Sequence, residues 1–261
     1  MVLPMSCLAD PGPDGWQTAR SSPQLLPGHA HVWRFALDWP QAELDRWTQD
    51  LSADERQRAA RFSFPQLRER FTAGRRLLRT ILSGYLGIPP AGIQFSYNGY
   101  GKPDLCGAAA GMGLNFNLSH TAGLALLGVS LGRRIGVDVE AIRENVKCEQ
   151  LAERFFSAHE VSDLLSLPCA DRQAAFFHCW TRKEAYIKAV GRGLSLALDS
   201  FDVSLCPTQP ARLLSVRDDP AEVDRWQVAT LTPATGYVAA LFAERPIHAS
   251  WFGAWPEPVS F

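Results

Sequence analysis

Two carboxylates lie two positions apart in the segment 136–140, which reads Gly-Val-Asp-Val-Glu. Side chains alternate along a strand, so a strand here places Asp138 and Glu140 on one face and Val137 and Val139 on the other, toward a core. Carboxylates held this close repel each other, and a hard divalent cation such as Mg²⁺ relieves that repulsion with oxygen ligands. An edge strand with solvated acids is the more ordinary explanation of this pattern taken alone.

The segment 180–188 adds a third carboxylate and a lysine. We expect it to be helical, and because successive helical residues rotate by about 100°, Glu184 and Lys188 then share one face with Trp180. Glu followed four residues later by Lys is also a common surface pair, worth about 0.2–0.5 kcal/mol. The spacing alone therefore favours a surface pair, whereas the two segments together would surround one hydrated cation and an anionic ligand.

The segment 117–121, Asn-Leu-Ser-His-Thr, offers a hydroxyl, an imidazole and backbone N–H groups at the expected end of a strand. Such a group suits a phosphate, although His120 is equally explained as a structural histidine in a turn. Ser119 and His120 lack a third partner, which disfavours a Ser/His hydrolase. Lys102, in Gly-Tyr-Gly-Lys-Pro, fits a plain hairpin turn as well as an anion site. The sequence has no Walker-type or G-x-G-x-x-G motif, which disfavours a P-loop enzyme and a Rossmann dehydrogenase.

Composition sets the class of protein that must carry these side chains. The chain has 261 residues, 46% apolar and 20% charged, which is enough to bury a core in one large domain or two lobes. A formal net charge of -1 offers no bulk attraction for nucleic acid or a membrane, and no segment approaches the roughly 20 apolar residues of a membrane helix. The six cysteines are scattered without a C-x-x-C pair, and the N-terminus lacks a signal peptide. We therefore expect a cytoplasmic monomer.

Apolar periodicity and turn residues predict an α+β protein. In the first half we expect a strand over 31–37, helices over 44–62 and 70–86, and strands over 93–95, 115–118, 124–130 and 135–140. In the second half we expect a helix over 176–190 and strands over 201–203, 226–229 and 237–242.

The second half of the chain echoes the first. The segments 122–127 and 235–240 read Ala-Gly-Leu-Ala-Leu-Leu and Thr-Gly-Tyr-Val-Ala-Ala, and each follows a helix, a Gly turn and a strand. We interpret this as two similar lobes, each a small antiparallel sheet packed with helices, with the ligand site at their junction. The predicted divisions are a loose leader over 1–29, an N-terminal lobe over 30–133, a C-terminal lobe over 134–245 and a tail over 246–261.

Six motifs in fixed order carry a resemblance that covers about residues 31–245. They are Gly-Arg-Arg-Leu-Leu-Arg at 74–79, Gly-Lys-Pro at 101–103, Phe-Asn-Leu-Ser-His at 116–120, Gly-Val-Asp-Val-Glu at 136–140, Phe-Phe-Ser at 155–157 and Trp-Thr-Arg-Lys-Glu-Ala-Tyr-Ile-Lys at 180–188. Taken together, they resemble the 4'-phosphopantetheinyl transferase superfamily, in its Sfp-like (surfactin-synthetase-activating) group. The resemblance implies a pseudodimer of two α+β lobes in one chain, with coenzyme A and Mg²⁺ bound at the lobe junction.

The resemblance also implies roles for the site residues. Asp138, Glu140 and Glu184 would hold Mg²⁺ against the pyrophosphate of coenzyme A. Glu184 would take the proton of the acceptor serine, directly or through a water, with Asp138 or a metal-bound water as the alternative base. Lys188 would offset the charge that grows on the leaving phosphate. Coenzyme A would be bound by side chains of the first lobe: Arg75, Lys102, Asn117, Ser119 and His120.

The implied reaction moves the phosphopantetheine arm of coenzyme A onto a serine of an acyl or peptidyl carrier protein and releases adenosine 3',5'-bisphosphate. Positioning and charge neutralisation do most of the catalysis in such a phosphoryl transfer. Two other functions stay open: a catalytically silent relative that binds coenzyme A or a carrier protein, and a Mg²⁺-dependent hydrolase of nucleotide pyrophosphates. The sequence does not distinguish fatty-acid, polyketide and nonribosomal-peptide carriers.

Overall fold

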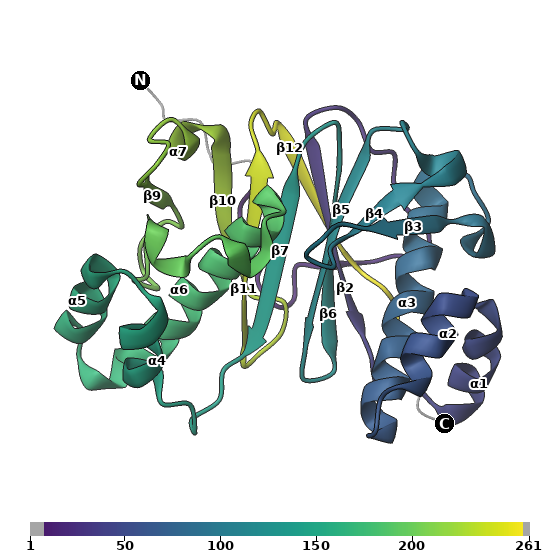
Figure 1. Ribbon diagram of the computed structural model, residues 1–261, viewed down its shortest axis with the longest axis horizontal. Helices are drawn as coiled ribbons and strands as arrows, with labels where there is room; N and C mark the ends of the chain where they lie inside the picture. The colour runs from purple at the N-terminus through teal and green to yellow at the C-terminus, as the bar shows by residue number, and fades with distance from the viewer. Residues whose placement is uncertain (1–7, 258–261) are drawn as a thin grey trace.

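One long helix packs against one sheet in each half of the chain (Figure 1). The structure is a computed structural model that describes residues 8–257. The first half contains β1 (Gln17–Thr18), β2 (His29–Ala36), α1 (Gln41–Asp50), α2 (Ala53–Ala60), α3 (Pro65–Leu86), β3 (Gln94–Tyr97), β4 (Pro103–Cys106), β5 (Leu114–Thr121) and β6 (Leu124–Leu131). The second half contains β7 (Ile135–Ala141), α4 (Cys148–Phe155), α5 (Ala158–Ser166), α6 (Cys169–Val190), β8 (Phe201–Val203), β9 (Leu213–Val216), α7 (Glu222–Arg225), β10 (Trp226–Leu231), β11 (Tyr237–Glu244) and β12 (Ala249–Ala254).

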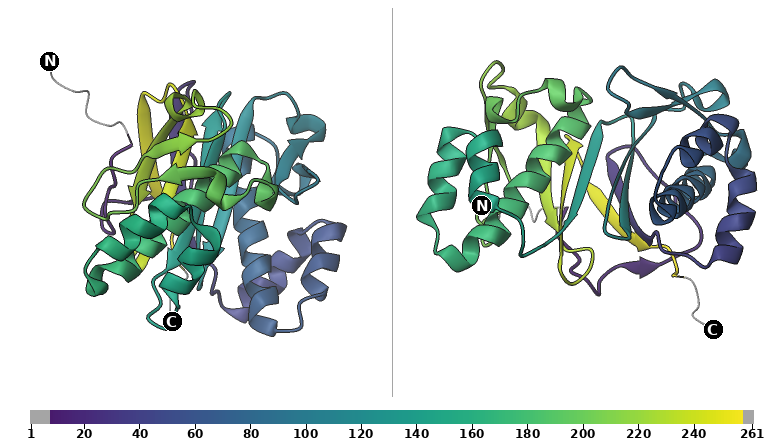
Figure 2. Two further views of the ribbon diagram at one scale, coloured as in Figure 1. Left: turned by 60° about the vertical axis from the view of Figure 1, so that its left-hand side comes forward. Right: turned by 60° about the horizontal axis from the view of Figure 1, so that its bottom comes forward.

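Two sheets lie between the helices. The N-terminal sheet has the strand order β1-β12-β2-β6-β5 and the C-terminal sheet has the order β10-β11-β7, with the small hairpins β3-β4 and β8-β9 beside them. The edge strands β5 and β7 meet in the middle of the molecule, and the helices lie on the two outer sides (Figure 2). The predicted α+β fold with two similar lobes is therefore confirmed.

The two lobes repeat one order of elements: a strand, two short helices, a long helix, a hairpin and two antiparallel strands. α3 and α6 have 22 residues each, and each ends at a glycine in the left-handed region, Gly87 (φ 66) and Gly191 (φ 79). Glycine adopts this conformation without the clash that a Cβ would cause. Between the sheets lies a shared apolar core, in which Val32 of one lobe and Val137 of the other are fully buried.

The predicted helix boundaries need correction. In place of one helix over 44–62, the chain forms α1 and α2 with a break before Ser52. The Ser52 N–H donates to the Glu55 carboxylate at 3.0 Å, a capping box that starts a new helix at this position. α3 and α6 also begin earlier than predicted, at Pro65 and Cys169. Proline is favoured in the first helical turn, where its missing N–H costs no hydrogen bond.

The leader and the tail both join the N-terminal sheet. β1 pairs in parallel with β12, and β12 pairs in parallel with β2. Trp16 is 6% exposed and meets Phe252 edge-on, while Trp251 and Trp255 pack against the core of the lobe. The prediction of a loose leader does not hold for residues 8–29, because Leu8 and Trp16 are buried and β1 pairs with β12, and residues 1–7 lie outside the described part. The lobe boundaries themselves stay a prediction.

Candidate active site

Polar side chains of β5 join the neighbouring edge of β7 at the lobe junction. The Val137 N–H donates to Asn117 Oδ1 at 2.8 Å, and Ser119 Oγ donates to Asp138 Oδ1 at 2.7 Å. Edge strands present unpaired backbone groups, and since β5 and β7 belong to separate sheets, side chains take the place of a backbone ladder. Alternation along β5 therefore points Asn117 and Ser119 toward the acidic strand.

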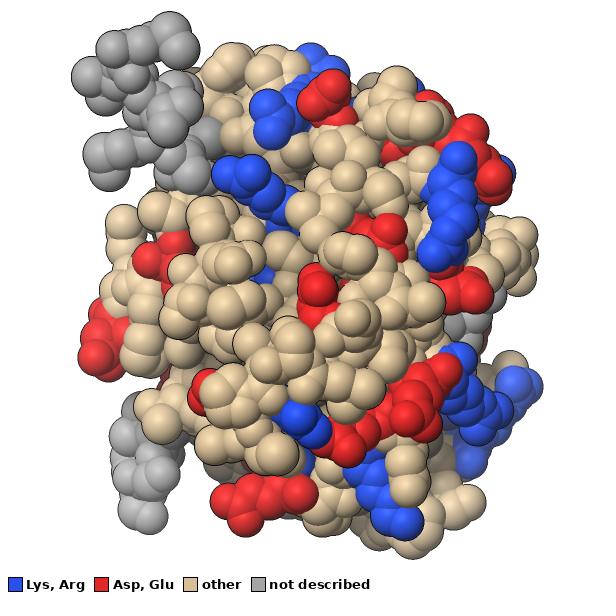
Figure 3. Space-filling view, turned by 90° about the vertical axis from the view of Figure 1, so that its left-hand side faces the viewer, with Lys and Arg blue, Asp and Glu red and all other residues tan. Residues whose placement is uncertain are grey.

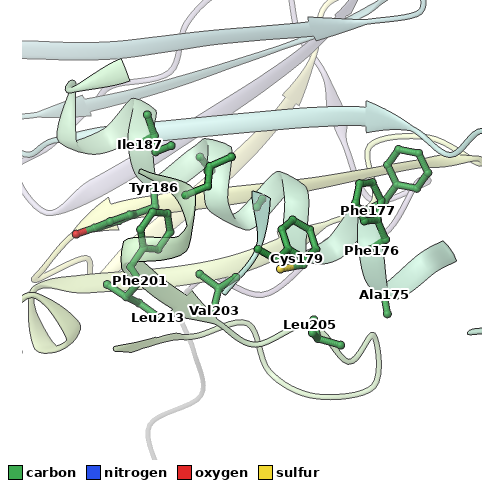
Figure 4. Close-up of a cluster of buried hydrophobic side chains, with 14 of the residues drawn as sticks. Ala175, Phe176, Phe177, Cys179, Tyr186, Ile187, Phe201, Val203, Leu205 and Leu213 are labelled. Carbon is green, nitrogen blue, oxygen red and sulfur yellow. The ribbon is translucent and has the colours of Figure 1, made fainter. Parts of the chain in front are cut away.

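A glycine lets α6 come close to β7. A Cβ at Gly136 would lie 2.2 Å from the carbonyl oxygen of Ala185 and 2.4 Å from the backbone nitrogen of Ala189, so a side chain here would push the helix away. On its other side α6 is held by an apolar cluster with β8 and β9, in which the rings of Tyr186 and Phe201 have centroids 4.7 Å apart (Figure 4). The helix is therefore fixed against the acidic strand.

Lys188 of α6 contacts the first acid of β7. Its Nζ donates to Asp138 Oδ1 at 2.5 Å and to Ser119 Oγ at 3.0 Å. Asp138 is 4% exposed, and its Oδ2 is buried with no hydrogen-bond partner among residues 8–257. A buried carboxylate oxygen without a donor is costly unless a ligand satisfies it. The carboxylate of Asp138 thus has one oxygen with two donors and one oxygen with none.

Glu140 and Glu184 complete an acidic group around Asp138. Burial raises the pKa of Glu140 and Asp138 raises it further, although Thr121 Oγ1 donates to Glu140 Oε2 at 3.2 Å. Burial also raises the pKa of Glu184, and the charges of Asp138 and Glu140 add to the effect. The charge of Asp138 thus makes the ionised forms of both glutamates less favourable, and a bound cation would relieve this repulsion.

The three carboxylates suit a hard cation, but they do not surround one as they stand. Within residues 8–257, no three Asp, Glu, His or Cys side chains are close enough together to hold a metal ion. The donor set nevertheless fits Mg²⁺, because it is all oxygen, one Asp138 oxygen lacks a donor, and repulsion raises the pKa of two of the acids. The metal-binding role of Asp138, Glu140 and Glu184 stays a prediction that these observations favour.

A cavity of about 440 Å³ opens beside the acids, between the turn of β3-β4 and the end of α6. Lys102 Nζ donates to the carbonyl oxygen of Lys188, and Asn98 Nδ2 donates to the carbonyl oxygen of Gly191 at 3.1 Å. These two bonds tie the turn of the N-terminal lobe to the last turn of α6. The residues around the cavity include Tyr100, Lys102, Pro103, Asn117, Glu184 and Lys188.

Two basic side chains lie on the N-terminal side of this site. Burial lowers the pKa of Lys102 to about 8, and the charge of Arg134 adds to the effect. The atoms around His120 desolvate its ring and lower its pKa, and the charge of Lys188 lowers it further. At pH 7 His120 is therefore neutral and can offer an N–H, whereas Lys102 keeps most of its positive charge.

The structure does not bring Arg75 to this group. Its Nε donates to Glu55 Oε1 at 2.5 Å and its Nη2 to the Tyr97 hydroxyl at 3.3 Å, and the residue is 7% exposed. Glu55 already offsets the charge of the guanidinium, so these contacts fix α2 against α3. The predicted role of Arg75 in binding coenzyme A has no support in these contacts and stays a prediction.

The sequence reasoning missed two residues that hold the site together, Thr121 and Asn98. The signal for Thr121 was present, because it continues the alternation of Asn117 and Ser119 along one face of β5. Asn98 gave only the signal of a turn residue, since its partner Gly191 lies in the other lobe.

Comparison with known proteins gives consistent matches over both lobes. Family models described as "4'-phosphopantetheinyl transferase, N-terminal" and "4'-phosphopantetheinyl transferase superfamily" match residues 38–130 and 134–242. The chain is 45% identical to 4'-phosphopantetheinyl transferase HetI of Nostoc sp. over 83% of this chain and 88% of that protein. It is 35% identical to 4'-phosphopantetheinyl transferase Sfp of Bacillus subtilis over 67% of this chain and 76% of that protein. The solved holo-[acyl-carrier-protein] synthase of Thermotoga maritima aligns with a TM-score of 0.34 at 24% identity, over 43% of this chain and 62% of its own.

Proposed function

Because the chain belongs to the 4'-phosphopantetheinyl transferase superfamily, we propose that it transfers the phosphopantetheine arm of coenzyme A to a serine of an acyl or peptidyl carrier protein. The proposed reaction depends on Mg²⁺ and releases adenosine 3',5'-bisphosphate. One observation carries this proposal: an acidic group and a lysine from one lobe meet a serine of the other lobe beside a cavity. With a cation held by the acids, such a group would neutralise linked phosphates on one side and place an acceptor hydroxyl on the other.

The carboxylates of β7 and α6 are the proposed cation ligands. Asp138, Glu140 and Glu184 would hold Mg²⁺, which when bound neutralises and orients the linked phosphates of coenzyme A. The oxygen of Asp138 that lacks a donor and the raised pKa values of Glu140 and Glu184 support this assignment.

Glu184 and Lys188 are the proposed catalytic residues. Glu184 would accept the proton of the carrier serine, directly or through a water, as the serine oxygen attacks phosphorus. The ammonium group of Lys188 lies beside the cavity on a side chain that is 28% exposed. It donates to a phosphate oxygen of the leaving group, where negative charge grows as the bond to phosphorus breaks.

Side chains of the N-terminal lobe are the proposed binding residues for the nucleotide part of coenzyme A. Lys102 supplies a positive charge below pH 8, and neutral His120 supplies an N–H at the end of β5. Ser119 lies between Asp138 and Lys188, so its hydroxyl can reorient toward a phosphate when Lys188 moves. Asn117 acts indirectly, because its Oδ1 accepts from the backbone of β7 and holds the two lobes in register.

We also propose that the enzyme works as a monomer in the cytoplasm, without nucleic acid or a membrane. Both halves of the site come from one chain, and the five cysteines described, Cys106, Cys148, Cys169, Cys179 and Cys206, are free thiols, as a reducing compartment favours. On the outer face of the C-terminal lobe, basic side chains lie beside acidic ones (Figure 3). No helix within residues 8–257 is long and apolar enough to cross a membrane.

The proposal is tested with purified enzyme, an apo carrier protein, coenzyme A and Mg²⁺. We expect the intact mass of the carrier to rise by one phosphopantetheine arm, and the gain to disappear with a chelator or when the acceptor serine is changed to alanine. Binding of coenzyme A without any mass gain on fatty-acid, polyketide and nonribosomal-peptide carriers would identify a silent relative. Release of adenosine 3',5'-bisphosphate without a carrier would identify a pyrophosphate hydrolase instead.

A further inference from the structure

We propose that Lys188 is a built-in counterion of Asp138 that a divalent cation must displace, and that this displacement delivers its ammonium group to the substrate phosphate. The inference rests on the proposed function, because it takes the same carboxylates as the ligands of the cation. It adds a property that the transferase activity does not require: the lysine and the cation compete for one carboxylate. The cation and coenzyme A then favour each other's binding.

The contacts of Asp138 show why Lys188 and a cation would compete for its carboxylate. Its Oδ1 accepts from Lys188 Nζ at 2.5 Å and from Ser119 Oγ at 2.7 Å, and its side chain is 6% exposed. Within residues 8–257, the ion pair that Asp138 forms is with Lys188. An ammonium group this close to Oδ1 offsets the negative charge of the carboxylate that an incoming cation needs, although Oδ2 has no donor in the described part of the chain. A second positive charge within one coordination shell is strongly repelled, because the buried surroundings screen charge poorly.

The surroundings of Lys188 allow its side chain to move while its backbone stays fixed. Its carbonyl oxygen accepts from Lys102 Nζ, and three residues later α6 ends at Gly191, whose carbonyl oxygen accepts from Asn98. The side chain itself is 28% exposed and borders the cavity of about 440 Å³. Displacement is therefore a change of side-chain rotamer toward the cavity, where the proposed substrate phosphates lie.

Competition has a thermodynamic consequence for the order of binding. Without substrate, a cation that displaces Lys188 leaves the ammonium group without a carboxylate, and this cost weakens cation binding. With coenzyme A present, the displaced ammonium group meets a phosphate, and the cost is offset. Coupling of this kind is reciprocal, so coenzyme A strengthens cation binding and the cation strengthens coenzyme A binding by the same factor.

The test is calorimetric titration of Mn²⁺ into the enzyme without coenzyme A. We expect Lys188→Met to bind Mn²⁺ about tenfold more tightly than the wild type, a factor within the usual range of coupling between sites. Lys188→Arg keeps the charge and should show no gain. The matched control is Arg143→Gln, which removes an exposed positive charge 3.7 Å from Glu140 Oε2 and should change Mn²⁺ affinity by less than about twofold.

A second readout keeps the test independent of catalysis. Mn²⁺ should raise the unfolding temperature of Lys188→Met more than that of the wild type, since a ligand that binds more tightly stabilises the folded state more at the same concentration. Circular dichroism establishes that each variant is folded, and Lys188→Gln replaces Lys188→Met if the latter does not fold. Equal or weaker Mn²⁺ binding by the neutral variants overturns the inference but leaves the transferase proposal intact. Failure of the wild type and the variants alike to bind Mn²⁺ overturns both the inference and the proposed metal dependence.

Discussion

The face of β7 that meets α6 carries Asp138 and Glu140, whereas the matching face of β2 that meets α3 carries Trp33 and Phe35. The strand register shows that Trp33 and Asp138 hold equivalent positions in the two lobes. Trp33 pairs with Leu127 and Asp138 pairs with Ala240, and both partners face the long helix of their own lobe. One lobe thus places aromatic rings where the other places carboxylates.

The tail of the chain fills the N-terminal counterpart of the site. The ring of Trp251 lies edge-on to Trp33 with centroids 4.6 Å apart, and Trp255 lies 6.1 Å from the same ring. The hydroxyl of Tyr85 on α3 accepts from Trp33 Nε1 and reaches His31 Nδ1, each at 2.9 Å. The comparison teaches that one scaffold gives a packed core where apolar side chains close it and an open, polar candidate site where carboxylates take their place.

Each long helix has an anchor, by which we mean an ion pair between a basic residue of the helix and the glutamate of a capping box. The two helices differ in the residue that follows the basic one. Glu55 of one capping box accepts from Arg79 at 2.9 Å, and Glu160 of the other accepts from Lys183 at 2.7 Å. Thr80 follows Arg79 as Glu184 follows Lys183. The anchor therefore belongs to the fold of both lobes, whereas the acid beside it occurs in the C-terminal lobe alone.

The first prediction, with the largest expected effect, compares Glu184 with Thr80. Glu184→Gln should lower the rate of carrier modification by about 10³-fold, because it removes a general base and a cation ligand together. Thr80→Val, at the matching place of α3, should leave the rate within about twofold, since its hydroxyl contacts only its own helix. Rates are measured from the intact mass of the carrier over time. A Glu184→Gln enzyme within tenfold of the wild type contradicts the assignment.

The second prediction separates the two anchors. Lys183 donates to Glu160 and to the carbonyl oxygens of Leu198 and Phe201, and both ionic side chains are 0% exposed. Glu160→Gln leaves this ammonium group buried without its counterion, and we expect a loss of about 3–5 kcal/mol in the free energy of unfolding. It should also raise the KM for coenzyme A, because Lys183 holds Leu198 and Phe201, which follow the segment 191–195 that borders the cavity.

Glu55, in the anchor of the N-terminal lobe, provides the control for this prediction. Glu55→Gln should also lower the free energy of unfolding in urea, but it should leave the KM for coenzyme A unchanged, since Arg75 and Arg79 lie away from the cavity. An equal rise in KM for both variants would show that the anchors act on the site only through overall stability.

Local patterns in the sequence predicted the acidic strand and the helix face. Alternation over 136–140 and the spacing of Glu184 and Lys188 depend on neighbours along the chain, so they can be read without the fold. The ion pair of Arg75 with Glu55 depends on a partner from another helix, and the sequence reasoning took its charge to be free for a ligand.

The sequence analysis did not predict how the tail pairs, for the same reason. β12 is short and pairs in parallel with β2, which lies at the other end of the described chain, so no turn or repeat marks the pairing. The sequence analysis expected Asp138 and Lys188 in one site but not the ion pair between them, which needs Gly136 to let α6 approach the strand. Individual pairings between distant segments, rather than element types, are what the sequence reasoning could not supply.

The third prediction tests whether the aromatic filling serves stability alone. Trp251 is half-buried and packs on Trp33, so Trp251→Ala should lower the free energy of unfolding by about 2–3 kcal/mol, somewhat less than for a fully buried tryptophan. The rate per folded enzyme should stay within about twofold of the wild type. Urea unfolding and initial rates at low temperature measure the two quantities. A large loss of rate in a folded variant would show that the two lobes are not functionally separate.

The smallest expected effect concerns Lys102, the lysine of the N-terminal lobe that borders the cavity. The pKa of Lys102 is lowered to about 8 by burial, so its ammonium group is charged at pH 7 and loses its proton as the pH rises through 8. We expect the KM for coenzyme A to rise about fivefold between pH 7 and pH 9, as a charged hydrogen bond to phosphate becomes a neutral one. In Lys102→Gln the KM should already be high at pH 7 and nearly independent of pH over this range. If the variant keeps the pH dependence of the wild type, another group causes it, and the N-terminal lobe contributes shape rather than charge to substrate binding.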